Sequence, residues 1–597
     1  MSDYHAPLDE MRFLLREIAG LPEIAALPGY EEASTDLAEA ILTEAGKLCR
    51  EELAPLNRSG DIAGSVYENG AVHTPAGFKE AYRHYVEGGW NSLPFDPAFG
   101  GQGLPWALAI PVQEMLNSAN MSFALCPLLN VGAVELLQTH GSDEQKATYL
   151  PKMISGEWTG TMNLTEPQAG SDVGAVKTRA EKQADGSYRI TGQKIYITYG
   201  EHDFTENIVH MVLARLPNAP EGTKGISLFL VPKFIPKEDG TPGARNDLRC
   251  ASIEHKLGIK ASPTCVMAYG DDGGATGYLI GQEHGGMACM FTMMNNARLA
   301  VGVQGIAIAE RATQQALAYA RERVQGRSLD GRTKDTRIVS HPDVRRMLMT
   351  MRATTEAARA LSYYTAGALD RALRHPEESE RSRQQQDVVE LLIPVVKAWC
   401  TDIGCEVASL GVQVHGGMGF IEETGAAQHY RDARILPIYE GTNGIQAMDL
   451  IGRKICRLEG KPVQAFLAGV QTTLNHLEDS SNEDLIAINE ALSEAAEALE
   501  EATDWLLETW KNDIEEAAAG ATPYLKLFGT VAGGWLLARG ALAARESLDR
   551  EEGDRDFLAA KIKTARFYAE NILPFATAQA EAARGSASVL ALETEFL

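Results

Sequence analysis

The stretch RILPIYEGTNGIQ, residues 434–446, places a single acidic residue between an apolar run and a loop-forming sequence. Apolar side chains occupy positions 435–439, Glu440 follows directly, and the glycines and polar residues of 441–444 favour a turn. A carboxylate that leaves water costs several kcal/mol unless it is paired or becomes neutral. Glu440 is therefore either an exposed loop residue or a residue with a chemical role.

The composition of the chain sets limits on that role. Its 597 residues, of which 45% are hydrophobic and 23% charged, are enough for a large core divided among several domains. The formal net charge of -26 repels phosphate at long range, which argues against binding to nucleic acid or to an anionic membrane surface. An anionic ligand would need a local cluster of arginine and lysine.

The cysteines and the first residues predict a reduced, soluble protein. Eight cysteines are scattered without a Cys-x-x-Cys pair, so we expect free thiols in the cytoplasm, and neither disulfides nor a metal site. The opening sequence MSDYHAPLDEMRFLL carries charges too early for a signal peptide. No uncharged apolar stretch reaches membrane-spanning length, so we expect no membrane span.

Changes in hydrophobic periodicity predict an α+β fold that is mostly α-helical and has four parts. Apolar residues recur at intervals of three and four in residues 1–160, which predicts an N-terminal helical domain. Short β-rich runs such as YRITGQKIYIT predict a small middle β-domain at 161–284. The helical period returns at 285–460, which predicts a C-terminal four-helix bundle that includes Glu440.

Residues 461–597 form the fourth part, an additional helical section. Its amphipathic spacing indicates that it packs on the bundle, and we expect it to contribute to a dimer contact. The sequence SSNE, residues 480–483, predicts a capping box at the start of one of its helices.

The fragment MNLTEPQAGSD, residues 162–172, is a candidate ligand loop in the middle domain. Its proline and glycine break regular structure and leave backbone N–H groups free, while Thr165 and Ser171 add hydroxyls. Such a loop can hold a polar ring or a phosphate. An ordinary surface turn is the alternative interpretation.

The fragment KIYITYG, residues 194–200, predicts a strand whose side chains alternate between two faces. Tyr196 and Thr198 are expected on one face, and Ile197 and Tyr199 on the other. An aromatic ring and a hydroxyl on the same face can cover a flat cofactor. Ordinary sheet packing is the alternative.

Two further fragments combine glycine or arginine with the ends of helices. QVHGGMGF, residues 413–420, has glycines that let a backbone approach a ligand closely, but it does not follow a strand as a dinucleotide-binding fingerprint would. YARERVQGR, residues 319–327, is a local cationic cluster in an acidic chain. By itself such a cluster is usually a solvated helix end.

Together, MNLTEPQAGSD, KIYITYG, YARERVQGR, QVHGGMGF and RDARILPIYEGTNGIQ resemble the acyl-CoA dehydrogenases in sequence, order and spacing. The resemblance covers about residues 35–460, and the motifs are specific when taken jointly. It implies a flavoprotein with an N-terminal helical domain, a middle β-domain and a four-helix bundle, assembled as a dimer or a tetramer.

The resemblance also implies where the cofactor is held. FAD would lie between the β-domain and the bundle, with its adenosine end reaching a neighbouring subunit. By motif match, the contacting residues are Thr165, Ser171, Tyr196, Thr198, Arg323, Gln325, Gln413, Gly416, Gly417 and Thr442.

In the chemistry that the resemblance implies, Glu440 is the base. It takes the α-proton of an acyl-CoA thioester while the β-hydrogen leaves as hydride to the flavin, which yields a trans-2-enoyl-CoA. An apolar pocket raises the pKa of such a base toward neutrality, and we expect Ile438 and Tyr439 to be its walls. The same dry pocket strengthens hydrogen bonds to the thioester oxygen, one of them from the backbone N–H of Glu440.

Four residues are expected to contact the substrate: Asn295, Arg298, Tyr439 and Gly441. Arg298, near the start of a long helix, is equally able to complete a structural salt bridge. The expected electron acceptor is an electron-transferring flavoprotein.

The chain exceeds the minimal length of the family and resembles its subgroup of about six hundred residues, which opens, as here, with YHAPLDEMRFLL. This subgroup includes 3-methylmercaptopropionyl-CoA dehydrogenases, of dimethylsulfoniopropionate breakdown, and bacterial fatty-acyl-CoA dehydrogenases. A cluster of methionines at 287, 290, 293 and 294 would suit a thioether substrate, although its spacing suits helix-core packing as well.

The preferred substrate is therefore 3-methylmercaptopropionyl-CoA, and the alternative is a medium- or long-chain fatty-acyl-CoA of β-oxidation. Two other functions remain open at this point. An acyl-CoA oxidase would reoxidise its flavin with oxygen, and a non-catalytic assembly scaffold would leave the flavin unchanged by every acyl-CoA.

Overall fold

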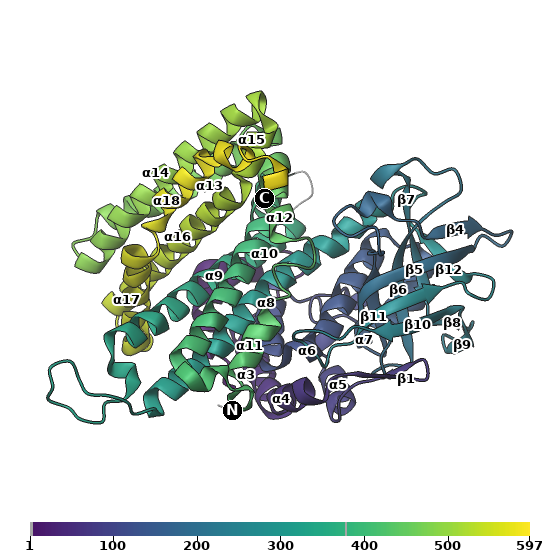
Figure 1. Ribbon diagram of the computed structural model, residues 1–597, viewed down its shortest axis with the longest axis horizontal. Helices are drawn as coiled ribbons and strands as arrows, with labels where there is room; N and C mark the ends of the chain where they lie inside the picture. The colour runs from purple at the N-terminus through teal and green to yellow at the C-terminus, as the bar shows by residue number, and fades with distance from the viewer. Residues whose placement is uncertain (1–3, 376–378, 597) are drawn as a thin grey trace.

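The chain passes from helices to a β-sheet and back to helices in a computed structural model, which describes residues 4–375 and 379–596 (Figure 1). The β-domain lies at the right of Figure 1, the C-terminal helices lie at the upper left, and the longest helices lie between them. This order confirms the predicted α+β fold. The boundaries of the four parts stay a prediction.

The N-terminal part is helical except for one hairpin. Its helices are α1 (Leu8–Leu14), α2 (Leu21–Ala25), α3 (Thr35–Leu48), α4 (Ala54–Ala63), α5 (Phe78–Glu87), α6 (Trp106–His140) and α7 (Asp143–Ser155). The strands β1 (Val66–Glu68) and β2 (Ala71–His73) interrupt them, which helical spacing did not predict. Asn69 and Gly70 join these strands with φ of 51° and 82°, and such an Asn-Gly pair is the usual sequence signal of a tight hairpin.

The middle part is an eight-stranded sheet with the strand order β10-β11-β5-β12-β7-β6-β3, in which β4 pairs with β5 and β6. Most neighbours are antiparallel, but β3 runs parallel to β6. The strands are β3 (Trp158–Asn163), β4 (Arg179–Lys182), β5 (Tyr188–Thr198), β6 (Asn207–Arg215), β7 (Ile226–Pro232), β10 (Leu248–Ile253), β11 (Thr264–Tyr269) and β12 (Ala275–Ile280). A separate pair, β8 (Phe234–Pro236) and β9 (Pro242–Arg245), extends this part.

The bundle is built on α8 (Gly286–Glu322), α9 (Pro342–Arg374) and α10 (Glu380–His415), with the shorter α11 (Ala426–Ala433) and α12 (Asn443–Asp449) beside them. Glycines let α8 and α10 approach closely, since a Cβ on Gly305 would lie 2.2 Å from the carbonyl oxygen of Cys400. Further along both helices, Tyr319 stacks on His415 with ring centroids 4.5 Å apart. The two helices therefore run side by side in the same direction.

The C-terminal section packs on the bundle, as its amphipathic spacing predicted. It contains α13 (Lys461–Glu478), α14 (Glu483–Asn512), α15 (Ile514–Ala519), α16 (Ala521–Asp549), α17 (Arg555–Asn571) and α18 (Phe575–Arg584). Gly529 of α16 faces Trp399 of α10 so closely that a Cβ would lie 2.3 Å from the indole ring. The expected capping box is wrong, because Asn482 is the N-cap of α14 and accepts from the backbone N–H groups of Asp484 and Leu485. A role in a dimer contact stays a prediction.

The first residues of the chain close onto this C-terminal section. Lys561 of α17 is buried and lies 2.7 Å from both Glu10 of α1 and Glu356 of α9. Phe13 and Phe557 meet edge to face, with ring centroids 5.8 Å apart. The two ends of the chain are thus joined through one buried ionic contact and one aromatic contact.

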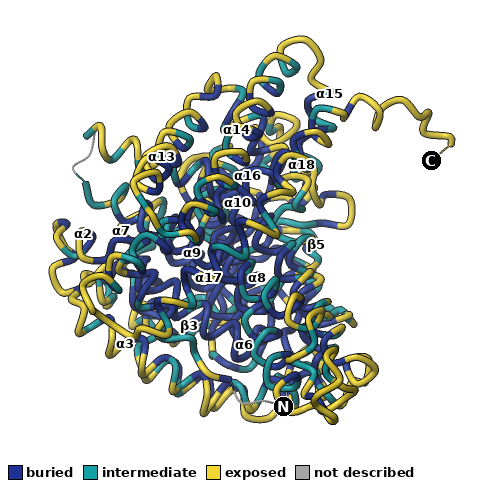
Figure 2. Tube along the Cα trace, turned by 90° about the vertical axis from the view of Figure 1, so that its left-hand side faces the viewer, coloured by how far each residue is buried: buried dark blue, intermediate teal, exposed yellow. Residues whose placement is uncertain are grey.

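In the part of the chain that the structure describes, two helices are long and apolar enough to cross a membrane by length and composition, namely α6 and α16. Within the protein, 94% and 83% of their most apolar windows are buried. Figure 2 shows the corresponding dark core, with α8, α10 and α16 passing through its centre. Such burial is typical of core helices, so these two helices need no lipid to cover them.

Candidate functional site

Glu440 sits in a strained loop between the bundle and α12. Its φ is 56°, and Gly441 follows with a φ of 82°, so the chain turns sharply at the carboxylate. A non-glycine residue in the left-handed region is uncommon and is found at functional sites more often than elsewhere. Directly after the turn, the hydroxyl of Thr442 accepts from the N–H of Ile445 at 3.3 Å and caps α12.

Side chains from α10 and α12 hold this loop at both ends. The Nζ of Lys397 donates to the carbonyl oxygen of Leu436 at 3.0 Å and to Oδ1 of Asn443 at 2.9 Å. The Nε2 of Gln446 donates to the carbonyl oxygens of Glu440 and Gly441 at 3.2 and 3.3 Å. Sequence reasoning assigned no role to Lys397 or Gln446, and no local spacing connects position 397 with the loop.

Burial raises the pKa of Glu440 to about 7, while the charges of Lys397 and Arg298 oppose that rise. The residue as a whole keeps intermediate exposure. Burial also lowers the pKa of Lys397 to about 7, against the opposing effects of Glu440 and Asp402. The loop therefore presents a carboxylate that takes up and releases a proton near neutral pH.

The expected apolar walls are only partly present. Tyr439 is half-buried, and its hydroxyl donates to Oε1 of Gln304. Ile438, in contrast, is 48% exposed, so its side chain does not close the site within one chain. Leu436 is the fully buried apolar residue of this loop.

Arg298 and Asn295 lie in the first half of α8, and Arg298 is close enough to Glu440 for its charge to act on that carboxyl. Arg298 is buried, and its Nη1 lies 3.2 Å from Oδ2 of Asp449, which is the structural salt bridge that sequence reasoning left open. Burial lowers the pKa of Arg298, and Asp449 and Glu440 oppose that effect. Asn295 is exposed and accepts from Arg298 at 3.5 Å.

The loop with Thr165 is fastened to β5, next to Tyr196 and Thr198. The N–H of Ile195 donates to the carbonyl oxygen of Thr165 at 2.9 Å, and buried Lys194 lies 2.8 Å from buried Glu166. Burial acts to raise the pKa of Glu166. The charge of Lys194 and several hydrogen bonds outweigh that effect and hold the pKa at about 2. Sequence reasoning missed this pair. Ser171 lies further along the loop and is exposed.

The strand β5 presents Tyr196 outward. Tyr196 is 61% exposed, whereas Ile197 and Tyr199 are buried and Thr198 is half-buried. The register against β11 shifts between Lys194 and Ile197, and Tyr196 has a φ of 60°. This bulge turns Lys194 into the sheet, although simple alternation would place it on the same face as Tyr196.

The remaining predicted cofactor residues gather at the far end of the bundle. Arg323 and Gln325 follow α8, and Gln413 and Gly416 lie at the end of α10. Stacking of Tyr319 on His415 brings these two helix ends together. From Arg298 to Arg323, α8 advances by about 37 Å at 1.5 Å per residue. The predicted cofactor residues thus form two separate groups in one chain.

The three glycines of QVHGGMGF occupy their positions for different structural reasons. A Cβ on Gly419 would lie 2.1 Å from the carbonyl oxygen of Val412, so internal packing requires this glycine. Gly416 has a φ of 60°, which favours glycine. A Cβ on Gly417 would meet nothing within 4 Å, and no positive φ requires glycine there. Its exposed backbone is therefore open to close approach by a ligand or another subunit.

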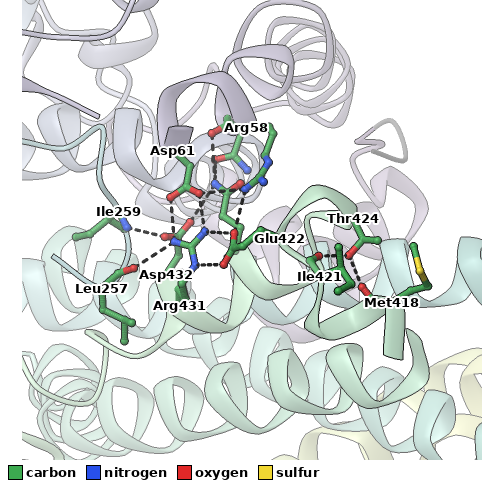
Figure 3. A network of polar contacts seen from close by, with 12 residues as sticks. Arg58, Asp61, Leu257, Ile259, Met418, Ile421, Glu422, Thr424, Arg431 and Asp432 are labelled. Atoms are coloured by element: carbon green, nitrogen blue, oxygen red, sulfur yellow. Dashed lines mark hydrogen bonds and ion pairs between the residues drawn. The ribbon is translucent and has the colours of Figure 1, made fainter. Parts of the chain in front are cut away.

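A polar network supports this glycine segment from three directions (Figure 3). Arg431 of α11 pairs with Glu422 at 3.0 Å and with Asp61 of α4 at 2.6 Å. The neighbouring Asp432 accepts from the N–H of Ile259, in the loop between β10 and β11, at 2.5 Å. The network joins the N-terminal helices, the β-domain and the bundle, and sequence reasoning did not find it.

The segment itself is closed by a hydroxyl that Figure 3 also shows. The Oγ1 of Thr424 donates to the carbonyl oxygens of Met418 and Ile421, both at 2.6 Å. The glycine segment is thus held in place by the residues that follow it.

The methionine cluster and the cysteines are mostly core residues. Met290 and Met293 are fully buried, whereas Met287 and Met294 are half-buried. The structure therefore does not show a pocket lined by all four methionines. All eight cysteines are free, as predicted, and six of them are buried. Among the described residues, no group of three potential metal ligands is present.

Family models match most of the chain in the order of the observed parts. "Acyl-CoA dehydrogenase, N-terminal domain" matches residues 35–157, the middle domain matches 161–271, and the C-terminal domain matches 284–455. The chain belongs to the acyl-CoA dehydrogenase family. A further model, "Acetyl-CoA dehydrogenase C-terminal like", matches residues 461–593. As the motifs predicted, this acyl-CoA dehydrogenase is a flavoprotein oxidoreductase that uses FAD.

Relatives of the same length are similar over nearly the whole chain. The 3-methylmercaptopropionyl-CoA dehydrogenase of Ruegeria pomeroyi is 51% identical, with 96% of each chain covered. A broad-specificity linear acyl-CoA dehydrogenase of Mycobacterium tuberculosis is 35% identical, with 97% of each chain covered. The crystal structure of Caenorhabditis elegans ACDH-11 in complex with C11-CoA shares the fold, with a TM-score of 0.78, 22% identity, and coverage of 96% of this chain and 93% of that one.

Proposed function

We propose that Glu440 is the base with which this acyl-CoA dehydrogenase removes the α-proton of an acyl-CoA thioester, and that the product is the trans-2-enoyl-CoA. The observation that carries this assignment is the Glu440 loop, where burial raises the pKa of the carboxyl to about 7. A general base is most effective when its pKa lies near the working pH. An exposed carboxylate would be too weak a base for a proton α to a carbonyl.

The surrounding side chains prepare Glu440 for that step. Lys397 and Gln446 fix the loop, so the carboxylate keeps one orientation while it takes the proton. The backbone N–H of Glu440 is proposed to donate to the thioester oxygen, which stabilises the charge that develops there. Tyr439, Gly441, Asn295 and Arg298 are the proposed substrate contacts. When FAD is bound, it accepts the two electrons that leave the acyl chain.

The residues present fit FAD. Tyr196 offers an exposed ring at the bulge of β5, Thr198 follows two residues later, and the backbone of Thr165 is bonded to that of Ile195. Gly417 leaves its backbone accessible at the other end of the bundle. We assign the cofactor contacts to these residues and to Ser171, Arg323, Gln325, Gln413, Gly416 and Thr442.

The proposed substrate is 3-methylmercaptopropionyl-CoA. It rests on the relative from Ruegeria pomeroyi, which shares half of its residues with this chain over nearly the full length. The alternative, a medium- or long-chain fatty-acyl-CoA, rests on the similarity to the broad-specificity linear acyl-CoA dehydrogenase. Burial of Met290 and Met293 removes the methionine cluster as an argument for the thioether.

The proposed partner is an electron-transferring flavoprotein, and the proposed assembly is a homodimer or tetramer in the cytoplasm. Free thiols agree with a reducing compartment. The separation of the two groups of cofactor residues within one chain supports an assembly in which two subunits share each FAD.

Anaerobic titration of the flavin tests the function and its substrate. The purified holoenzyme is mixed with 3-methylmercaptopropionyl-, butyryl-, octanoyl- or palmitoyl-CoA, and flavin absorbance is followed. We expect the methylthio substrate to reduce the flavin fastest, whereas faster reduction by octanoyl- or palmitoyl-CoA would support the alternative. Glu440→Gln should keep FAD and slow reduction by several orders of magnitude. Near-normal reduction by that variant would remove Glu440 as the base.

A further inference from the structure

Lys397 lies behind the Glu440 loop, on α10, and is fully buried. Its two hydrogen-bond acceptors, Leu436 and Asn443, stand on either side of residues 437–442. One ammonium group therefore ties both ends of the loop to a helix of the bundle. An ammonium ion has three donors and no acceptor, which suits a site with two converging oxygens.

We propose that Lys397 is a positioning residue for the base. It fixes the loop that presents Glu440, and in its charged form it favours the ionised carboxylate against the effect of burial. The inference rests on the proposed role of Glu440 and adds a residue to it. A purely structural lysine would hold the loop without changing the protonation of Glu440, so the two roles are separable by experiment.

The charged groups near the Glu440 loop come from four elements, one of which is the segment Leu450–Ile455 with Arg453. Lys397 and Asp402 lie on α10, Arg298 lies on α8, and Asp449 lies on α12. Asp449 pairs with Arg298 at 3.2 Å and with Arg453 at 3.3 Å, so one carboxylate is shared by two arginines.

Lys397 is in a different position, because its bound acceptors are a carbonyl oxygen and an amide oxygen rather than a carboxylate. The nearest acidic residue along its hydrogen bonds is Asp402, which accepts from Nδ2 of Asn443 at 2.8 Å. Lys397 is accordingly the first of the charges that oppose the raised pKa of Glu440. The lysine and the glutamate are expected to titrate as a pair.

Two variants separate the charge of Lys397 from its hydrogen bonds. Lys397→Met removes both, whereas Lys397→Gln removes the charge and keeps one donor group for the two oxygens. Each holoenzyme is reduced anaerobically with whichever of octanoyl-CoA and 3-methylmercaptopropionyl-CoA reduces the wild type faster, at pH values from 6 to about 9.5. The loss of a neighbouring opposite charge raises a carboxyl pKa by about one unit or more. The acid limb of the plot of reduction rate against pH should therefore move to higher pH by that amount in both variants. Reduction near pH 6.5 should then be about tenfold slower, with recovery at high pH.

Hydrogen exchange supplies a second measurement that does not depend on turnover. The peptide of residues 434–446 should exchange faster in Lys397→Met than in the wild type, and Lys397→Gln should lie between them. The matched control is Lys454→Met, which removes a lysine that also contacts α10, through Glu390 at 2.9 Å, but does not touch the loop. It should leave both the pH profile and the exchange unchanged.

The outcomes distinguish this proposal from the proposed function. An acid limb that stays in place in both Lys397 variants, while Glu440→Gln is inactive, would overturn the role of Lys397 and leave Glu440 as the base. Near-normal reduction by Glu440→Gln would remove the base itself, whatever the exchange of the loop shows. Failure of both Lys397 variants to fold would reduce Lys397 to a structural residue.

Discussion

Replacing Glu440 with glutamine should make the protein more stable above neutral pH, although it removes the proposed base. In the folded protein the pKa of this carboxyl is about 7, against its usual value of 4.5. The folded state therefore favours the protonated form. The free-energy cost of burying the charged carboxylate in the folded protein is absent below pH 4.5, increases between pH 4.5 and 7, and reaches its full value above pH 7.

The size of this effect follows from the shift. A difference of about 2.5 units, at about 1.4 kcal/mol each, corresponds to roughly 3 kcal/mol that the wild type loses at high pH and that a neutral glutamine does not lose. For a cooperative unit on the order of 300 residues, the entropy of unfolding is about 0.6 kcal/mol/K. The melting temperature of Glu440→Gln should then exceed that of the wild type by about 5 °C at pH 8, and by less at pH 5.5.

Thermal unfolding of both holoenzymes across this pH range is the measurement. The matched control is Glu459→Gln, because Glu459 has a similar φ of 54° but a side chain that is 80% exposed. Its variant should melt with the wild type at every pH. A difference between Glu440→Gln and the wild type that does not change with pH would refute the assigned burial of the charge, and so would a variant that melts lower at pH 8.

Four further variants test the cofactor segment, the flavin loop and the C-terminal section. Gly417→Ala should fold normally and bind FAD more weakly, measured by flavin retention on gel filtration, whereas Gly419→Ala should lower the melting temperature because its Cβ would meet a backbone oxygen. Glu166→Gln leaves a buried lysine unpaired, so we expect about 3 to 5 kcal/mol of destabilisation and loss of FAD, measured by denaturation and flavin absorbance. Gly529→Ala should push α16 away from Trp399, and limited proteolysis should then release fragments after residue 460.

The sequence predicted most of the fold because the signals for it are local. Periodicities of three to four and of two located the helices and strands. The carboxylate at the end of an apolar run singled out Glu440, and the family resemblance then proposed it as the base. Even the unexpected hairpin β1–β2 carries a local signal, the Asn69-Gly70 turn.

The long-range contacts that position the site residues and shift their pKa values could not be predicted from local sequence signals. Lys397 approaches the Glu440 loop only because α10 and α12 pack against each other, and no spacing along the chain records that contact. A lysine in a helix is usually a solvated residue, so its burial had no local signal. The pair Glu166–Lys194 is similar, because it depends on a bulge that turns Lys194 away from the exposed face of β5.

The two groups of cofactor residues lead to a consequence for assembly. Arg298 lies beside Glu440, and Arg323 lies about 37 Å further along the same helix, a separation longer than an extended dinucleotide. We therefore propose that the far end of one bundle meets the near end of another to complete each FAD site. In such an assembly the exposed backbone of Gly417 and the 86% exposed ring of Phe420 would be covered. This would explain why position 417 is a glycine although packing within the chain does not require one, and why the apolar ring of Phe420 is exposed in the single chain. Each subunit would then supply the base for one site and the glycine segment for another, so that dissociation into single chains and loss of FAD should occur together.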